Sequence, residues 1–310
     1  MVTSVDAVSF LVIVSTSAVA ALIVSVVAPK LTVPVVVVEL LLGIVIGPQG
    51  TGLAEVDDFT EFLGNLGLGM LFYFAGYEID FERIRGRPLK LAAMGWGLSL
   101  ALAYGLGAAL AVVGVVVSLV YTGSALATTA IGTLIPILRD SGDLKTRFGT
   151  YLLGAGAVGE FGPILLITIL LSATNPLNQA LLLIAFIGLA VLCGVLAVRS
   201  VGRGWAALER TLESSSQLIV RLVVVLVVAL LALANDLGLD LLLGGFVAGM
   251  ISRLALRGHE IELFESKITA LGYGLLVPFF FVTSGMNFDL DSLIGSPTAM
   301  LKLPLFAGLF

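Results

Sequence analysis

Apolar stretches of about 20 residues, the length of a membrane-spanning helix, recur from one end of this 310-residue chain to the other. A helix of that length crosses about 30 Å of hydrocarbon. Charged residues make up 12% of the chain, against about 25% in soluble domains, so a soluble core could not absorb the apolar surface. The runs do not alternate in polarity, which disfavours an outer-membrane barrel. The sequence therefore predicts an all-α polytopic membrane protein without a soluble module.

Proline and glycine breakers such as Pro48 and Pro176 separate the apolar runs. We expect helices at residues 5–28, 32–48, 60–78, 88–113, 115–138, 148–172, 179–198, 217–234, 238–255 and 268–286, and the start of another near Pro297. That last run stops after about half a membrane span. We therefore expect residues 1–310 to form one transmembrane domain of about ten complete helices that is incomplete at its C-terminus and inactive by itself.

Lysine and arginine occupy every second connection between these helices, as the positive-inside rule requires of cytoplasmic loops. The inner connections hold Lys30, Arg83, Arg85, Arg87, Lys90, Arg139, Lys145, Arg147, Arg199, Arg203, Arg210, Arg253, Arg257 and Lys267. The pattern predicts an inner-membrane protein with its N-terminus outside. The outer connections carry Glu55, Asp57, Asp58, Asp236, Asp240, Asp289 and Asp291. These acids could concentrate cations at the outer mouth, or they could simply be solvated.

Composition also limits the partners. The net charge of −5 comes without a basic patch, so we expect no nucleic-acid partner. The single cysteine, Cys193, lies in an apolar run and is expected to be a buried packing residue. The only histidine, His259, lies in a charged inner connection and is expected to be solvated. With no cluster of ligand residues around either of them, we expect no metal site and no cofactor.

Two acids, Glu39 and Glu160, fall near the centre of predicted helices, where a charged group is costly and therefore a functional candidate. Glu160 lies among Gly156, Gly159 and Gly162, which leave space for an ion or a neighbouring backbone. Pro163 has no N–H, so the carbonyl of Gly159 loses its helical donor. A carboxylate beside a freed carbonyl is a candidate cation site, although a protonated Glu bonded between helices is the alternative. Glu39 is better suited to a structural polar anchor that hydrogen-bonds between helices.

Thr128 and Thr129 lie side by side among small residues in the run 115–138. Adjacent threonines disfavour a regular helix and offer hydroxyl oxygens. An interrupted helix near the midplane can present oxygens to an ion without exposing backbone to lipid. The alternative is that both hydroxyls bond back to their own helix. The segment precedes Glu160 in the chain, so we expect the two to share a site.

Four segments together resemble the monovalent cation:proton antiporter-2 family, which includes bacterial sodium/proton exchangers and glutathione-gated potassium efflux proteins. They are Val33–Pro48, Leu66–Phe81 with its Phe74-Ala-Gly-Tyr-Glu-Ile-Asp80, Gly123–Gly132, and Leu276–Leu290 with its Pro278-Phe-Phe-Phe-Val-Thr-Ser-Gly-Met286. The resemblance implies a homodimer with 13 helices, a dimerisation scaffold and a core of two inverted three-helix repeats. The helices that begin near 88, 115 and 148 would form the first repeat, and most of the second would lie beyond Phe310.

In the same family comparison, Thr128 and Thr129 match the unwound crossover, and Glu160 matches the essential acid. That acid is usually Asp preceded by Asp, Asn or Gln, so Gly159 is a departure. The expected function is antiport of Na⁺ or K⁺ against H⁺, with Glu160 as the shared acid and Thr128, Thr129 and the Gly159 carbonyl as oxygen donors. A gated monovalent cation channel or efflux protein is the alternative. A membrane-embedded hydrolase would need a nucleophile and a base within the helices, whereas the only histidine, His259, is expected in a connection.

Overall fold

The computed structural model describes most of the chain, and its regular elements there are all helices. The described residues are 6–27, 34–79, 84–116, 118–129, 138, 142–143, 146–170, 176–256, 261–297, 300–302, 304 and 308. Five helical segments among them are long and apolar enough to cross a membrane: Ala7–Val26, Arg87–Val112, Ala180–Ser200, Leu218–Asp236 and Glu262–Met286. The predicted all-α polytopic membrane fold is confirmed. The expected run that starts near Pro297 lies largely outside the described residues.

The helices group into two compact units, and several helices pass from one into the other. Unit 1 comprises Met1–Phe72, Gly204–Ala229 and Gly258–Pro304, and unit 2 comprises Tyr73–Arg203, Leu230–Arg257 and Leu305–Phe310. The helices of unit 1 are α1 (Ala7–Val27), α2 (Val35–Ile46), most of α3 (Asp58–Glu78), the end of α9 (Pro176–Leu212), most of α10 (Leu218–Asp236), α12 (Glu262–Leu271), α13 (Val277–Met286) and the short α14 (Leu290–Ile294). Those of unit 2 are α5 (Arg87–Val112), α6 (Leu119–Leu126), α8 (Arg147–Leu170), most of α9, the end of α10 and α11 (Leu241–Ala255).

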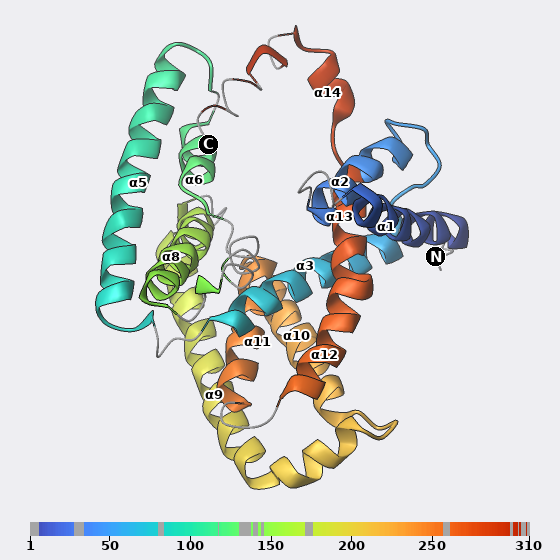
Figure 1. The fold of residues 1–310 in the computed structure, drawn as a ribbon. Coiled ribbons are helices and arrows are strands. Elements are labelled where there is room, and N and C mark those ends of the chain that lie inside the picture. Colours follow the sequence, from blue (N-terminus) through green and yellow to red (C-terminus); the bar gives the residue numbers. More distant parts are fainter. Residues whose placement is uncertain are drawn as a thin grey trace. The chain divides into compact units, whose positions relative to one another are not determined.

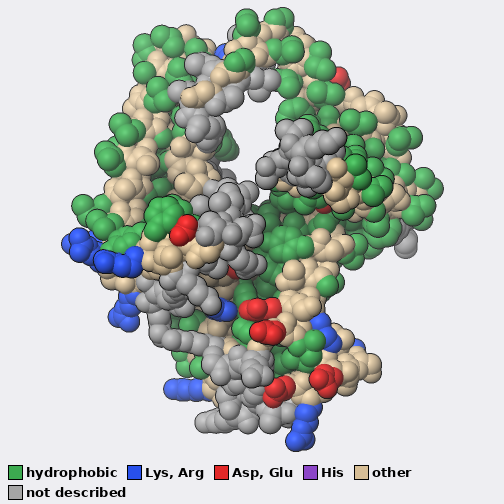
Figure 2. Space-filling model, in the orientation of Figure 1, with side chains coloured by type: hydrophobic (Ala, Val, Ile, Leu, Met, Phe, Trp, Pro, Cys, Tyr) green, Lys and Arg blue, Asp and Glu red, His purple; other side chains and the backbone are tan. Residues whose placement is uncertain are grey.

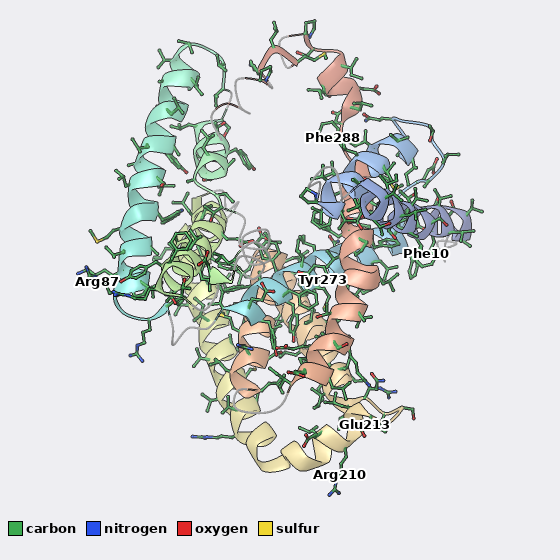
Figure 3. The ribbon with its side chains drawn as sticks, in the orientation of Figure 1. Phe10, Arg87, Arg210, Glu213, Tyr273 and Phe288 are labelled. Atoms are coloured by element: carbon green, nitrogen blue, oxygen red, sulfur yellow. The ribbon has the colours of Figure 1, made fainter. Side chains whose placement is uncertain are left out.

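In unit 1, α2 packs against α13 with backbone close to backbone, and α1 packs on both. A Cβ at Gly43 would press on the Val282 carbonyl oxygen and lie 3.0 Å from the Cα of Gly285, so only glycine allows this approach. From α1, the ring of Phe10, which is labelled in Figure 3, lies 5.7 Å from the ring of Phe279. Between α12 and α13 the chain makes a π-helical turn, Gly272–Leu276.

In unit 2, α5, α6 and α8 pack against one another and lie side by side in Figure 1. These are the helices that the family resemblance assigns to the first three-helix repeat. The outward face of α5 is strongly apolar, with Met94, Leu98 and Leu102 each more than 60% exposed. Figure 2 shows hydrophobic side chains over this helix. An exposed face of this kind is suited to lipid rather than water.

Polar contacts within unit 1 join segments that were predicted on the same side of the membrane. At the expected outer side, the Asp6 N–H donates to Asp57 Oδ2 over 3.0 Å, and the Asp291 N–H donates to Gln49 Oε1 over 2.9 Å. At the expected inner side, the Lys267 ammonium donates to the carbonyl of Leu212 at the end of α9. The contacts agree with the predicted alternation of helix directions within this unit.

The connection expected after residue 198 is instead helical, because α9 continues to Leu212. The expectation that Arg199, Arg203 and Arg210 lie in an irregular loop is therefore wrong. Apolar runs mark the part of a helix inside the bilayer, whereas the helix itself ends only where the local sequence stops favouring it. Residues 200–212 contain Ala, Leu, Glu and Arg and no proline, so they extend the helix.

Candidate functional site

Helix α6 ends just before Thr128 and Thr129, where the sequence predicted an interruption. Helix α6 is only eight residues long: Ser118 caps its start by accepting a hydrogen bond from the Tyr121 N–H, and it ends at Leu126. Thr128 and Thr129 are exposed and have no regular structure, and residues 130–137 lie outside the described part of the chain. The Thr128 hydroxyl bonds back to the Ser124 carbonyl over 2.9 Å, which is the local bonding considered as the alternative for both threonines.

Thr129 is bonded to α8 instead. Its N–H donates to the Gly159 carbonyl over 3.1 Å, and its hydroxyl donates to the Gly156 carbonyl over 3.2 Å. Pro163 cannot donate to Gly159, so Thr129 supplies the donor that the helix itself lacks. The contact also explains Gly159: a Cβ there would lie 3.1 Å from Thr129 Cγ2 and 3.3 Å from its Cβ. The structure thus brings together Thr129 and Gly159, two of the residues that the sequence assigned to one site.

Glu160 follows Gly159 directly on α8 and is partly buried. The other charged residues of α5, α6 and α8 are Arg87, Lys90 and Arg147, all in the first turn of their helices. Arg147 is 13 positions before Glu160, which corresponds to about 20 Å along the helix axis. A partly buried carboxyl in the middle of an apolar helix can bind either a proton or a cation.

Two aromatic residues of α5 line the same packing region, and neither was singled out in the sequence. The Tyr104 hydroxyl is 3.0 Å from the Oγ of Ser124, which is fully buried, and the Tyr104 ring covers Gly123. Trp96 lies against Gly162, two residues after Glu160, and its buried Nε1 has no hydrogen-bond partner within the described residues. A tyrosine and a tryptophan within an otherwise apolar helix were the available signal, because each brings a polar group that needs a partner.

Glu39 belongs to unit 1, on the face of α2 that also carries Gly43. It is 2% exposed, and its carboxyl makes no hydrogen bond to a described residue. The polar-anchor role therefore stays a prediction.

The cysteine and the histidine of the chain were also predicted to have no part in a site. Cys193 on α9 is partly rather than fully buried, and His259 lies outside the described residues.

Several acids of the expected outer connections cap helices. Asp57 Oδ1 accepts from the Thr60 N–H near the start of α3, Asp240 Oδ1 accepts from Leu242 N–H at α11, and Asp289 Oδ1 accepts from Ser292 N–H at α14. Hydrogen bonds hold the pKa of the Asp57 carboxyl below its usual range: the bond from the Asp6 N–H has the largest effect, and the bonds from the Thr60 N–H and hydroxyl add to it. These contacts give the three acids a structural role beyond solvation.

The arrangement in unit 2 defines a class of protein: a polytopic helical membrane protein in which a short helix ends in threonines bonded to the backbone of a second, acid-bearing helix. Comparison with known proteins agrees. The profile of the sodium/hydrogen exchanger transmembrane family matches residues 16–310, so the chain belongs to that family.

Several relatives named as antiporters are similar over most of the chain. The Na(+)/H(+)-K(+) antiporter GerN of Bacillus cereus is 28% identical over 284 residues, which are 90% of this chain and 71% of that protein. The putative Na(+)/H(+) antiporter YjbQ of Bacillus subtilis is 26% identical, over 89% of this chain and 47% of its own length. A Na(+)/H(+) antiporter of Enterococcus hirae is 25% identical, over 89% of this chain and 72% of its own length.

Proposed function

We propose that this protein is a secondary active antiporter that exchanges a monovalent cation, Na⁺ or K⁺, for protons. The observation that carries the proposal is the pair of hydrogen bonds from Thr129 to the Gly159 and Gly156 carbonyls, which hold the chain after α6 against α8 at the residue that precedes Glu160. Membership of the sodium/hydrogen exchanger family supports it, as do relatives that are named antiporters of these ions.

Exchange needs a site that holds either a proton or a cation, and a single carboxyl can do this. Burial favours its neutral, protonated form, whereas a bound cation favours the charged form, so the two ligands compete. We assign that carboxyl to Glu160. The Thr128 and Thr129 hydroxyls donate their protons to carbonyls and keep their lone pairs for a cation, and the Gly159 carbonyl has a second lone pair. Alternating access requires these helices to move so that the site faces each side in turn.

One acid sets a simple stoichiometry. Each cycle carries one proton in one direction and one cation in the other, so no net charge moves. Exchange in vesicles should therefore not respond to a membrane potential set with valinomycin. A clear voltage dependence would show that a second charge takes part.

The decisive variant is Glu160→Gln, which keeps the shape of the side chain and removes the titrating group. In the full-length protein it should abolish cation-dependent proton flux without lowering the amount in the membrane. Glu160→Asp should retain some flux with a shifted pH profile, because the acid remains but its reach changes. Full flux from Glu160→Gln would exclude this residue as the transport acid.

A gated cation channel is the alternative function. In proteoliposomes an exchanger moves labelled cation against its gradient when a proton gradient is imposed, and a channel only dissipates the cation gradient. We expect uphill uptake. We further propose that the protein is a transporter and not an enzyme, with ions and protons as its ligands, because its relatives are named antiporters.

We also propose that the protein lies in the inner membrane as a homodimer with its N-terminus outside. The distribution of Lys and Arg between alternate connections supports the orientation. A cysteine introduced at Asn178, an exposed residue near the start of α9, should react with a membrane-impermeant maleimide added outside intact cells. A cysteine at Gly204 should react only after permeabilisation. The reverse result would overturn the orientation.

A further inference from the structure

An apolar groove runs along unit 2 between α9 and α11. Its volume is about 470 Å³, within the usual range of about 300–1,000 Å³ for small-molecule sites. Gly194 opens its middle: a Cβ there would still be 3.6 Å from Ile251 Cγ1 on the opposite wall. Val191 and Leu254, one from each wall, are 61% and 45% exposed, so the groove opens at the protein surface. Its occupant is therefore something that reaches it from outside unit 2.

The groove has the length of one lipid leaflet. On α9 its lining runs from Ile187 to Arg199, which is about 18 Å at 1.5 Å per residue. Half of the hydrocarbon core measures about 15 Å. Along that length the α9 and α11 residues that line it are apolar, and Arg199 is the only charged one. Because Arg199 is the lining residue closest to the C-terminal end of α9, the charge lies at one end of an apolar track.

We propose that this groove binds an anionic phospholipid, with one acyl chain along α9 and α11 and the phosphate at the Arg199 guanidinium. A second helix is a poorer match: helices associate in membranes through small residues and hydrogen bonds, and the walls offer the small residues Ala190 and Gly194 but no neutral polar side chain for a hydrogen bond. A lipid supplies both an apolar chain of the required length and an anion at its end. Arginine binds phosphate with several donors in a fixed plane. In the orientation proposed above, the lipid belongs to the cytoplasmic leaflet, where anionic lipids attract basic residues.

The test compares two lipids that differ in headgroup charge. The full-length protein is reconstituted in vesicles containing diazirine-labelled phosphatidylglycerol or the matching phosphatidylcholine, illuminated, and digested for peptide mapping. We expect phosphatidylglycerol to label the α9 and α11 peptides about fivefold more than phosphatidylcholine, since one basic residue near the membrane surface contributes about 1 kcal/mol. Arg199→Gln should remove this preference and leave labelling by phosphatidylcholine unchanged.

The matched control is Arg210→Gln, which removes the same charge from the exposed last turn of α9, beyond the groove (Figure 3). It should keep the fivefold preference. Gly194→Leu should fill the groove and reduce labelling by both lipids at these peptides. If that variant does not insert, the comparison of the two arginine variants still decides, because neither changes the groove walls.

Equal labelling by the two lipids in the unaltered protein, or a preference that survives Arg199→Gln, would overturn the proposal. Occupation by a second copy is tested with Val191→Cys in a Cys193→Ala background, which removes the native thiol two residues away. Rapid formation of a disulfide-linked dimer in vesicles, with no lipid labelling of α9, would assign the groove to a protein interface instead. Monomeric behaviour with strong phosphatidylglycerol labelling supports the lipid site.

Discussion

Gly159→Ala should detach the interrupted segment from α8, and Gly154→Ala on the same helix provides a matched control. The alanine Cβ at 159 would collide with the Thr129 side chain, so the two Thr129 hydrogen bonds to α8 would be lost. At about 1 kcal/mol each, that loss is about 2 kcal/mol. Replacing glycine by alanine in a helix returns about 1 kcal/mol, so the net destabilisation is about 1 kcal/mol.

At Gly154 the new Cβ would meet only ordinary contacts, 3.7 Å from Pro88 backbone atoms and 3.8 Å from the Ala92 Cβ. This variant should therefore gain about 1 kcal/mol, and the two variants should differ by about 2 kcal/mol. Reversible unfolding in mixed micelles, followed by circular dichroism, measures the difference. In vesicles, Gly159→Ala should also lower the exchange rate at least about tenfold, because a shift of about 1 Å in the position of a functional group can lower a rate by about a hundredfold. Equal stability and equal flux for the two variants would refute the assignment of Gly159 as the contact point for Thr129.

Three further measurements test other parts of the structure. Gly43→Ala should destabilise the packing of α2 on α13 by about 1–3 kcal/mol in the same unfolding assay, whereas Gly105→Ala, which points into open space, should be neutral or stabilising. Asp57 accepts the Asp6 N–H and the Thr60 donors, and its pKa is lowered from 3.8, so its contribution should be complete above about pH 4 and lost as the pH falls through the lower folded value. Asp57→Ala should therefore be less stable than the unaltered protein at neutral pH, with a gap that closes in acid. Tyr104→Phe removes the hydroxyl partner of buried Ser124 and should cost about 1 kcal/mol of stability, as measured by the same unfolding curves, with the amount in the membrane unchanged.

Local sequence was sufficient for the helices and for part of the site. Apolar runs end where prolines, glycines and charges occur, so the observed α1, α2, α3, α5, α8, α10 and α11 begin and end within a few residues of the predicted bounds. The break after Leu126 was also predictable, because two adjacent threonines weaken a helix. Pro163 also showed that the Gly159 carbonyl would need another donor. A helical carbonyl accepts from the N–H four residues later, and proline has no N–H.

The identity of that donor was set by packing across 30 residues of chain. The sequence placed Thr128 and Thr129 on equal terms, yet only Thr129 is bonded to α8, and Thr128 bonds back to Ser124. Which hydroxyl faces another helix depends on the rotation and distance of α6 relative to α8, and no local pattern encodes these. The roles of Tyr104 and Trp96 beside small residues have the same origin.

What the sequence by itself determined is therefore the apolar helices, the alternation of basic residues between their connections, and the presence of an acid and two threonines within apolar runs. Each of these follows from residues close together in the chain. The tertiary structure decided that Thr129 bonds to the α8 carbonyls and that α2 and α13 come into backbone contact at Gly43 and Gly285. It also decided that α9 and α11 leave a groove that ends at Arg199. Such contacts join segments far apart in sequence, and they depend on how whole helices pack once the bilayer has made each of them stable.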